Sequence, residues 1–197
     1  MTHHPHPPHG AGKSSFDLID PEKLFPALRL KPGETVLDLG CGEGRYTLPL
    51  AFRVGRGGMV YAADLWEEGL VSLEDMARKE GLTNVRTLLA DVSQSLPLPA
   101  ASLDLALMAT VLHDLAEVGQ AEGGLAETAR LVKPGGRLAV VEFKKIEGPP
   151  GPPPHIRLSP EEVATLVFPY NFTPGDLIDL SPHLYLAMFT KSASEHP

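Results

Sequence analysis

The stretch VLDLGCGEG, residues 36–44, joins an apolar run directly to a Gly-x-Gly-x-Gly loop. We expect the apolar run to form a strand and a helix to begin near Glu43, which is the order of elements in a nucleotide-binding α/β unit. Glycine lets a backbone turn tightly and approach a ligand closely, because no Cβ intervenes. Gly40, Gly42 and Gly44 are therefore expected to shape a nucleotide-sized pocket at the carboxyl end of this strand.

The spacing of the three glycines differs from that of a dinucleotide-binding loop. That fingerprint is G-x-G-x-x-G, whereas here the third glycine comes one residue early and Arg45 stands in its place. Asp38 and Glu43 also flank the loop, and their negative charge disfavours a bound pyrophosphate but favours a cationic ligand. A nicotinamide-dependent dehydrogenase is therefore the weaker interpretation of this loop.

Strand and helix patterns alternate along the rest of the chain. Five strands are expected at residues 35–39, 59–64, 84–90, 102–109 and 136–143. Strands joined by helical crossovers form a mostly parallel sheet whose two faces are both covered. The segments 176–180 and 183–191, separated by Ser-Pro, predict an antiparallel hairpin at the edge of that sheet.

Proline and glycine mark the boundaries of the predicted helices. One helix is expected to end near Val132, where Lys-Pro-Gly-Gly at residues 133–136 predicts a sharp stop and a turn. Residues 148–154 are all glycine or proline, so we expect a stiff, extended segment without helix. Ser159, followed by Pro160 and two glutamates, predicts the N-terminus of another helix.

An aspartate ends the second expected strand, and another directly follows the third. Asp64 follows Gly44 by 20 residues, and a carboxylate there can accept both hydrogen bonds of a ribose diol. Asp91 could accept from an adenine amino group, and Leu65 could form an apolar wall for the base. A single glycine loop or strand-end aspartate is often no more than a tight turn or a helix N-cap. Three adjacent strand ends with suitable groups form one crevice, which favours a binding site.

Four segments make the chain resemble a known family. In family order and spacing they are VLDLGCGEGRYTLPLA (36–51), VYAADL (60–65), LLADVSQSLPLPAASLDLALMATVLHDL (88–115) and ETARLVKPGGRLAVVEFKK (127–145). With them the chain closely resembles the class I S-adenosylmethionine-dependent methyltransferases, particularly the ubiquinone/menaquinone-biosynthesis branch (methyltransferase type 11). The resemblance implies a Rossmann-like three-layer α/β sandwich with a mostly parallel seven-stranded sheet of order 3-2-1-4-5-7-6, its last strand antiparallel. It also implies methyl transfer to a small-molecule acceptor at a carbon, oxygen or nitrogen atom.

The resemblance assigns roles to residues along the crevice. S-adenosylmethionine is the implied cofactor, and its sulfonium and amino groups are both cationic, which suits the acidic glycine loop. Its methionine part is expected beside Asp38 and Gly40, and its ribose at Asp64. The whole implied cofactor-binding set is Asp38, Gly40, Gly42, Gly44, Asp64, Leu65, Asp91 and Val92 at the adenine, and Thr110 facing the methyl donor.

His113 is the candidate general base. It follows the expected fourth strand, where the crevice meets the acceptor, and histidine readily takes a proton at neutral pH. A methyl group on a sulfonium is already activated, so a base is needed only if the acceptor must lose a proton. A histidine that merely lines the pocket is the alternative. Glu142, at the end of the fifth strand, could face the acceptor, but an exposed strand-end carboxylate is the favoured expectation.

The composition limits the partners and the chemistry. The 197 residues fit one α/β domain, and a formal charge of −8 makes nucleic acid an improbable partner, because binding it needs a basic surface. Cys41 is the only cysteine, which excludes an intramolecular disulfide, a cysteine-based zinc site and cysteine-dependent methylation of arsenite. With no apolar run typical of a signal peptide or membrane span, a cytoplasmic protein is expected.

Residues 1–19 are expected to form a flexible His/Pro-rich segment, a candidate lid, ahead of a single methyltransferase domain at 20–197. The histidines within residues 3–9 could bind a transition metal, but no acidic residue or cysteine joins them, so no metal site is predicted. Two classes of function remain: an enzyme, or an S-adenosylmethionine-binding module or regulatory subunit without its own catalysis. The histidine after the fourth strand and the candidate lid favour the enzyme.

Overall fold

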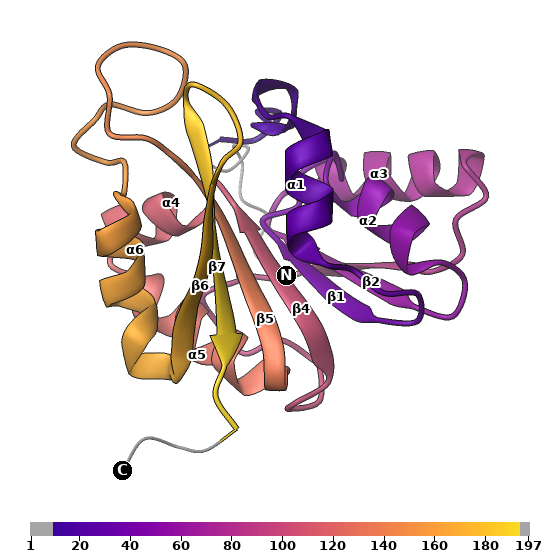
Figure 1. The fold of residues 1–197 in the computed structure, drawn as a ribbon. Helices are drawn as coiled ribbons and strands as arrows, with labels where there is room; N and C mark the ends of the chain where they lie inside the picture. Colours follow the sequence, from indigo (N-terminus) through magenta and orange to yellow (C-terminus); the bar gives the residue numbers. More distant parts are fainter. Residues whose placement is uncertain (1–9, 194–197) are drawn as a thin grey trace.

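The computed structural model describes residues 10–193. Its centre is a seven-stranded sheet of order β3-β2-β1-β4-β5-β7-β6, in which β7 runs antiparallel to both of its neighbours (Figure 1). The strands are β1 (Thr35–Leu39), β2 (Met59–Asp64), β3 (Val85–Leu89), β4 (Leu103–Ala109), β5 (Val132–Phe143), β6 (Phe172–Asp179) and β7 (Leu184–Lys191). The predicted strand order and the antiparallel last strand are confirmed.

Helices cover both faces of the sheet, which gives three layers (Figure 1). On one face lie α1 (Pro21–Leu28), α2 (Thr47–Val54) and α3 (Glu67–Lys79), and on the other α4 (Leu112–Glu117), α5 (Ala121–Leu131) and α6 (Pro160–Val167). Short 3-10 helices occupy Phe16–Leu18 and Phe168–Tyr170. Within residues 10–193, no helix has both the length and the apolar character needed to cross a membrane.

The side chains of β4 alternate between the two outer layers. Leu105 and Leu107 pack in the cluster that contains α1 and α2, whereas Ala106 and Met108 pack with α4, α5 and α6. A strand buried on both faces is a continuous apolar run, as this one is. Full burial of one leucine stabilises the fold by about 1.5–3 kcal/mol. The central strands therefore hold their carboxyl ends, and the polar groups that follow, in fixed positions.

The glycine loop is longer than predicted. Residues 42–46 form turns, and α2 begins at Thr47 instead of near Glu43. Gly42 and Gly44 have φ values of 53° and 81°, and this left-handed backbone cannot belong to a right-handed helix. The Gly42 amide therefore stays outside any helix, where it can bond to a side chain of the neighbouring strand.

The turn predicted at residues 133–136 is wrong. The helix α5 ends at Leu131 as expected, but β5 begins at once with Val132, which pairs with Leu103 of β4. The register shifts between Leu103 and Leu105, so the Lys-Pro-Gly-Gly stretch is an irregularity inside the strand pairing. A bulge absorbs extra residues without ending a strand.

The predicted start of α6 is confirmed by a capping box. The Ser159 hydroxyl accepts a hydrogen bond from the Glu162 amide, and the Glu162 side chain accepts one from the Ser159 amide. Pro160 occupies the first turn, where its missing N–H costs nothing. This helix start fixes the end of the segment that leads from β5 to α6.

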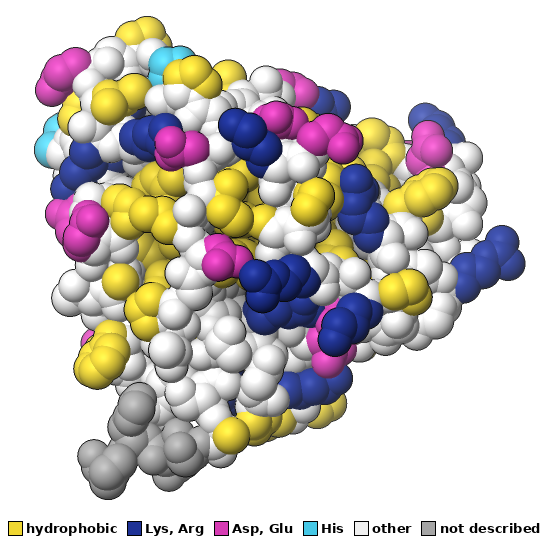
Figure 2. All heavy atoms as spheres, in the orientation of Figure 1, with side chains coloured by type: hydrophobic (Ala, Val, Ile, Leu, Met, Phe, Trp, Pro, Cys, Tyr) yellow, Lys and Arg dark blue, Asp and Glu magenta, His cyan; other side chains and the backbone are white. Residues whose placement is uncertain are grey.

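The predicted C-terminal hairpin is present as β6 and β7, but β6 begins earlier, at Phe172. The pairing is irregular between Pro174 and Leu177, because proline has no N–H to donate to the ladder. As the edge strand, β6 is largely exposed. Figure 2 shows this face of the molecule, on which acidic and basic side chains are interspersed with hydrophobic ones.

Candidate active site

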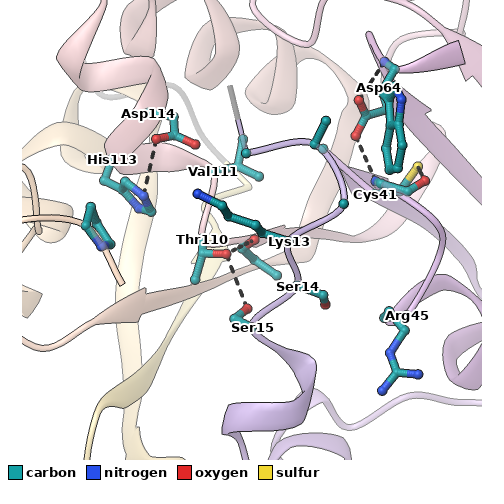
Figure 3. Close-up of a pocket in the computed structure, with 18 of the residues that line it drawn as sticks. Lys13, Ser14, Ser15, Cys41, Arg45, Asp64, Thr110, Val111, His113 and Asp114 are labelled. Atoms are coloured by element: carbon teal, nitrogen blue, oxygen red, sulfur yellow. Dashed lines mark hydrogen bonds and ion pairs between the residues drawn. The ribbon is translucent and has the colours of Figure 1, made fainter. Parts of the chain in front are cut away.

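A cavity of about 730 Å³ lies at the carboxyl ends of the central parallel strands. The segments that line it include residues 10–15 (the N-terminal segment), residues 40–43 of the glycine loop, residues 64–66 after β2, the residues after β3 and after β4, the end of β5, and residues 151–156. Figure 3 shows Cys41 and Asp64 on one side of the N-terminal segment and His113 and Asp114 on the other. We call these two sides the glycine-loop half and the α4 half of the cavity.

Gly40 and Gly42 line the cavity, and Gly44 does not. A Cβ on Gly40 would lie 2.5 Å from the Cγ2 atom of Val111, so no larger residue fits between the loop and the turn after β4. A Cβ on Gly44 would lie 2.2 Å from the Leu73 side chain. Gly44 therefore serves the packing of the loop against α3, whereas Gly40 and Gly42 form a wall of the cavity.

Asp64 holds the glycine loop through its carboxylate. One oxygen accepts from the Gly42 amide at 2.7 Å and the other accepts from the Trp66 amide at 2.8 Å. Each carboxylate oxygen has two acceptor sites, so both oxygens can accept one further hydrogen bond from a ligand. Leu65 and Trp66 line the cavity next to Asp64, with Leu65 45% exposed. The glycine-loop half thus combines a carboxylate with an apolar wall.

Neither Asp38 nor Asp91 lines the cavity. Asp38 is buried and accepts the Thr47 hydroxyl at 2.6 Å, and its burial raises the pKa of this carboxyl to about 7. One oxygen of Asp91 accepts from both the amide and the hydroxyl of Ser93, so this side chain caps a turn. Val92, which lies between Asp91 and Ser93 in the sequence, does line the cavity. The third strand end therefore presents Val92 to the cavity, and the Asp91 carboxylate is bonded to Ser93.

Thr110 lies at the centre of the cavity in a strained conformation. Its φ of 57° is uncommon for a β-branched residue. The Thr110 amide donates to the Val141 carbonyl at 2.8 Å, and the hydroxyl lies 2.7 Å from the Ala109 carbonyl oxygen and 3.2 Å from the Ser15 hydroxyl. Such strain persists where surrounding contacts determine it, and it is frequent at functional sites. Here it turns the chain sharply from β4 towards α4.

The N-terminal segment crosses the cavity between its two halves (Figure 3). The Ser15 hydroxyl is buried and lies 2.9 Å from the Tyr46 hydroxyl as well as 3.2 Å from that of Thr110. Phe16 packs edge-on against the Tyr46 ring, with 5.0 Å between the ring centroids. Gly12 lies beside the Trp66 ring. Residues 10–15 therefore line the cavity, their role as a lid stays a prediction, and the histidines at residues 3–9 fall outside the described residues.

His113 and Glu142 form a buried pair in the α4 half. The His113 Nδ1 atom lies 2.7 Å from one carboxylate oxygen of Glu142, and the His113 amide donates to the other oxygen at 3.1 Å. Glu142 is fully buried and His113 is 4% exposed. Because an ionised carboxylate only accepts, it holds the ring with a proton on Nδ1 and leaves the lone pair of a neutral imidazole on Nε2. The Nε2 atom lies 3.3 Å from Asp114.

The charges around His113 favour its protonated form. Burial lowers the pKa of the imidazole, but the hydrogen bond and the charge of Glu142 raise it, as do the charges of Asp114 and Glu117. The balance is a pKa above the ordinary value of 6.5. Lys13 lines the same cavity and brings a positive charge from the N-terminal segment. The imidazole therefore gives up its proton at a higher pH than an unperturbed histidine does.

Comparison with known proteins agrees with this geometry. A family model described as a methyltransferase domain matches residues 37–140, more than half of the chain. The chain belongs to this methyltransferase family. Among solved structures it is similar to an S-adenosylmethionine-dependent methyltransferase from Aquifex aeolicus, with 34% identity and a TM-score of 0.80 over 89% of this chain and 92% of the other.

Two curated relatives of this methyltransferase have named activities. A ubiquinone/menaquinone biosynthesis C-methyltransferase from Teredinibacter turnerae is 34% identical over 85% of this chain and 63% of its own length. A nocamycin O-methyltransferase from Saccharothrix syringae is 33% identical over 77% of this chain and 48% of its own. The chain therefore spans about half to two thirds of these relatives. The family model and the similarity to the Aquifex aeolicus structure make this chain an S-adenosylmethionine-dependent methyltransferase, and in sequence it is similar to the ubiquinone/menaquinone-biosynthesis C-methyltransferases.

The methyltransferase structure corrects the expectation for Glu142. This carboxylate is not exposed but fully buried against His113. The sequence carried a signal for this arrangement, because Glu142 stands inside the apolar run LAVVEF, and a charge within a buried strand is almost always paired. Phe143 also lines the α4 half, and Arg157 bonds to the carbonyls of the segment that lines it, and neither residue stood out in the sequence.

Proposed function

We propose that the enzyme transfers the methyl group of S-adenosylmethionine to a small-molecule acceptor at a carbon, oxygen or nitrogen atom, and that His113 takes a proton from that acceptor. The observation that carries this proposal is the buried His113–Glu142 pair in the half of the cavity away from the glycine loop. A protein that only bound the cofactor would have no need for an oriented base at that place.

The glycine-loop half fits the cofactor. Gly40 and Gly42 allow close approach of a ligand, Asp64 has two acceptor sites free for a ribose diol, and Leu65 with Trp66 offers an apolar face to a base. A cavity of about 730 Å³ lies within the range of small-molecule sites. When bound, S-adenosylmethionine supplies an electrophilic methyl group on a sulfonium.

The side chains of the α4 half would then orient and deprotonate the acceptor. His113 accepts the acceptor proton on Nε2, and Glu142 stabilises the resulting imidazolium through Nδ1. The N-terminal segment excludes water from the centre of the cavity, where Thr110 lies. Alignment of donor and acceptor contributes the rest of the rate enhancement.

The alternative is a cofactor-binding module or regulatory subunit without its own catalysis. The two are separated by a screen of quinol, phenol, amine and nucleoside acceptors with labelled methyl donor. Transfer of label to any of them supports the enzyme, and tight cofactor binding without any transfer supports the module. Location in the cytoplasm and the absence of nucleic acid among the partners stay predictions, the latter in keeping with the mixed charges on the face in Figure 2.

The first expected result concerns the choice of cofactor. S-adenosylmethionine and its demethylated product S-adenosylhomocysteine should bind, and NAD should not, because the acidic loop disfavours a pyrophosphate and the third glycine stands one residue too early. Titration calorimetry with the three ligands measures this. A measurable heat of binding for NAD, together with none for S-adenosylmethionine, would contradict the proposal.

The second expected result concerns the N-terminal segment. Hydrogen exchange at residues 10–19 should slow by about 10-fold or more when S-adenosylhomocysteine binds, because the ligand would fill the cavity that this segment lines. Ser15→Ala should reduce this protection, since Ser15 joins Tyr46 to Thr110, whereas Ser95→Ala removes an exposed hydroxyl outside the cavity lining and is the control. Equal exchange rates with and without ligand would show that the segment does not respond to ligand binding and is not a lid.

A further inference from the structure

Among residues 10–193, Arg157 is the largest buried side chain that bears a charge, with 1% of its surface exposed. All five of its N–H groups donate to backbone carbonyl oxygens, at 2.7–3.1 Å, and these belong to Lys144, Ile146, Gly148, Pro150 and Pro152. Every carbonyl comes from the segment that leads from β5 to α6. We call residues 144–157 the proline loop.

We call these five hydrogen bonds the cage, and they hold the middle of a loop whose two ends are held by other hydrogen bonds and ion pairs. Residues 148–154 are glycine and proline only, so the prolines among them have no N–H with which to form secondary structure. The guanidinium supplies donors instead, one for each of five carbonyls that would otherwise lose their hydrogen bonds to water. A lysine in this place has at most three N–H groups and no planar fork, so it could not reproduce the cage.

The same loop forms a wall of the α4 half of the cavity. Gly151, Pro152, Pro153 and Ile156 line it, beside Phe143. A Cβ on Gly151 would lie 2.6 Å from the Phe143 ring, so loop and ring are in close contact. Phe143 in turn stands edge-on to His113, with 6.2 Å between ring centroids. The wall is therefore apolar, and it is placed against the base.

We infer that Arg157 is a positioning residue for the acceptor: its guanidinium, bonded to five carbonyls, holds the proline loop as a preformed wall that selects acceptors by the size of their apolar face. This inference rests on the proposed function, because it assigns the α4 half to the acceptor. A wall that is ordered before binding saves the entropy of ordering it on binding. A rigid wall also rejects an acceptor that is one methylene too large, which a mobile loop would accommodate.

Arg157→Met and Arg157→Lys test the inference, with Arg78→Met on the exposed face of α3 as the matched control. The Met variant should exchange the amides of residues 145–156 at least about 10-fold faster and raise the KM for the acceptor by about 10-fold, with kcat within a factor of three. For two acceptors that differ by a single methylene, the ratio of their kcat/KM values should fall towards 1. Affinity for S-adenosylhomocysteine should not change, and the Lys variant should lie between Met and wild type.

Binding of phenol to the protein loaded with S-adenosylhomocysteine, followed by saturation-transfer NMR, gives a readout without turnover. Weaker phenol binding in Arg157→Met supports the inference even if the acceptor screen fails, and that failure would count against the proposed function alone. If the Arg157 variants do not fold, Gly151→Ala is the second test. Its added Cβ would press on the Phe143 ring and displace the loop, so phenol binding should change while the cofactor site stays intact. Unchanged exchange, KM and phenol binding in the folded variants would overturn the inference.

Discussion

Asp64→Ala is expected to weaken the binding of S-adenosylhomocysteine by roughly 10²- to 10⁴-fold. The carboxylate lies at the end of β2 with one acceptor site free on each oxygen, which matches the two hydroxyls of a ribose. Each hydrogen bond to a charged group is worth about 1.5–3 kcal/mol, and both would be lost. Titration calorimetry with the wild type and the variant measures the change.

Part of this loss would come through the glycine loop, because Asp64 also accepts from the Gly42 and Trp66 amides. Asp64→Asn separates the contributions, since an asparagine oxygen can still hold one of these amides but carries no charge. Asp91→Ala should have a smaller effect, because Asp91 bonds to Ser93 outside the cavity lining. An unchanged dissociation constant in Asp64→Ala would remove Asp64 from the site.

The sequence predicted the parts of this protein that depend on local pattern. Buried parallel strands are continuous apolar runs, so β1, β2 and β4 could be placed within a residue or two. Residues that directly follow such strands meet at one edge of the sheet, and this predicted that Gly40, Asp64 and Thr110 would share a cavity. The order of all seven strands came from the family resemblance, because periodicity carries no information about which strands are neighbours.

What the sequence did not predict depends on contacts between distant residues. Glu142 faces His113 instead of solvent because α4 packs against the end of β5. His113 and Glu142 are 29 residues apart in the sequence. The cage around Arg157 is formed by main-chain carbonyls. Because every residue carries one, no pattern of side chains in the sequence predicts the cage. The start of β5 at Val132 likewise depends on its pairing with Leu103.

Replacing His113 is expected to lower turnover by about 10²- to 10⁴-fold while affinity for S-adenosylhomocysteine stays nearly unchanged, provided that the acceptor must lose a proton. His113→Ala would leave the fully buried Glu142 carboxylate without its partner, which destabilises a fold by about 3–5 kcal/mol. His113→Gln keeps an N–H donor for Glu142 and removes only the base. Thermal unfolding of both variants shows whether turnover is lost because the protein is destabilised or because the base is missing. His155→Ala replaces an exposed histidine of the proline loop and is the control.

The pH dependence of the rate identifies the group that acts. Because a base must be neutral to accept a proton, and the pKa of His113 is raised above 6.5, the rate in the wild type should rise with pH through a midpoint above 6.5 and then level off. Glu142→Gln removes the charge that raises this pKa and leaves only a neutral acceptor for the ring, so the midpoint should move to lower pH, although Asp114 and Glu117 still raise it and Lys13 still faces the cavity. His113→Gln should lose the rise altogether. Turnover that survives in His113→Gln with an unaltered pH profile would show that the site works by alignment alone, with the acceptor already deprotonated or in no need of a base.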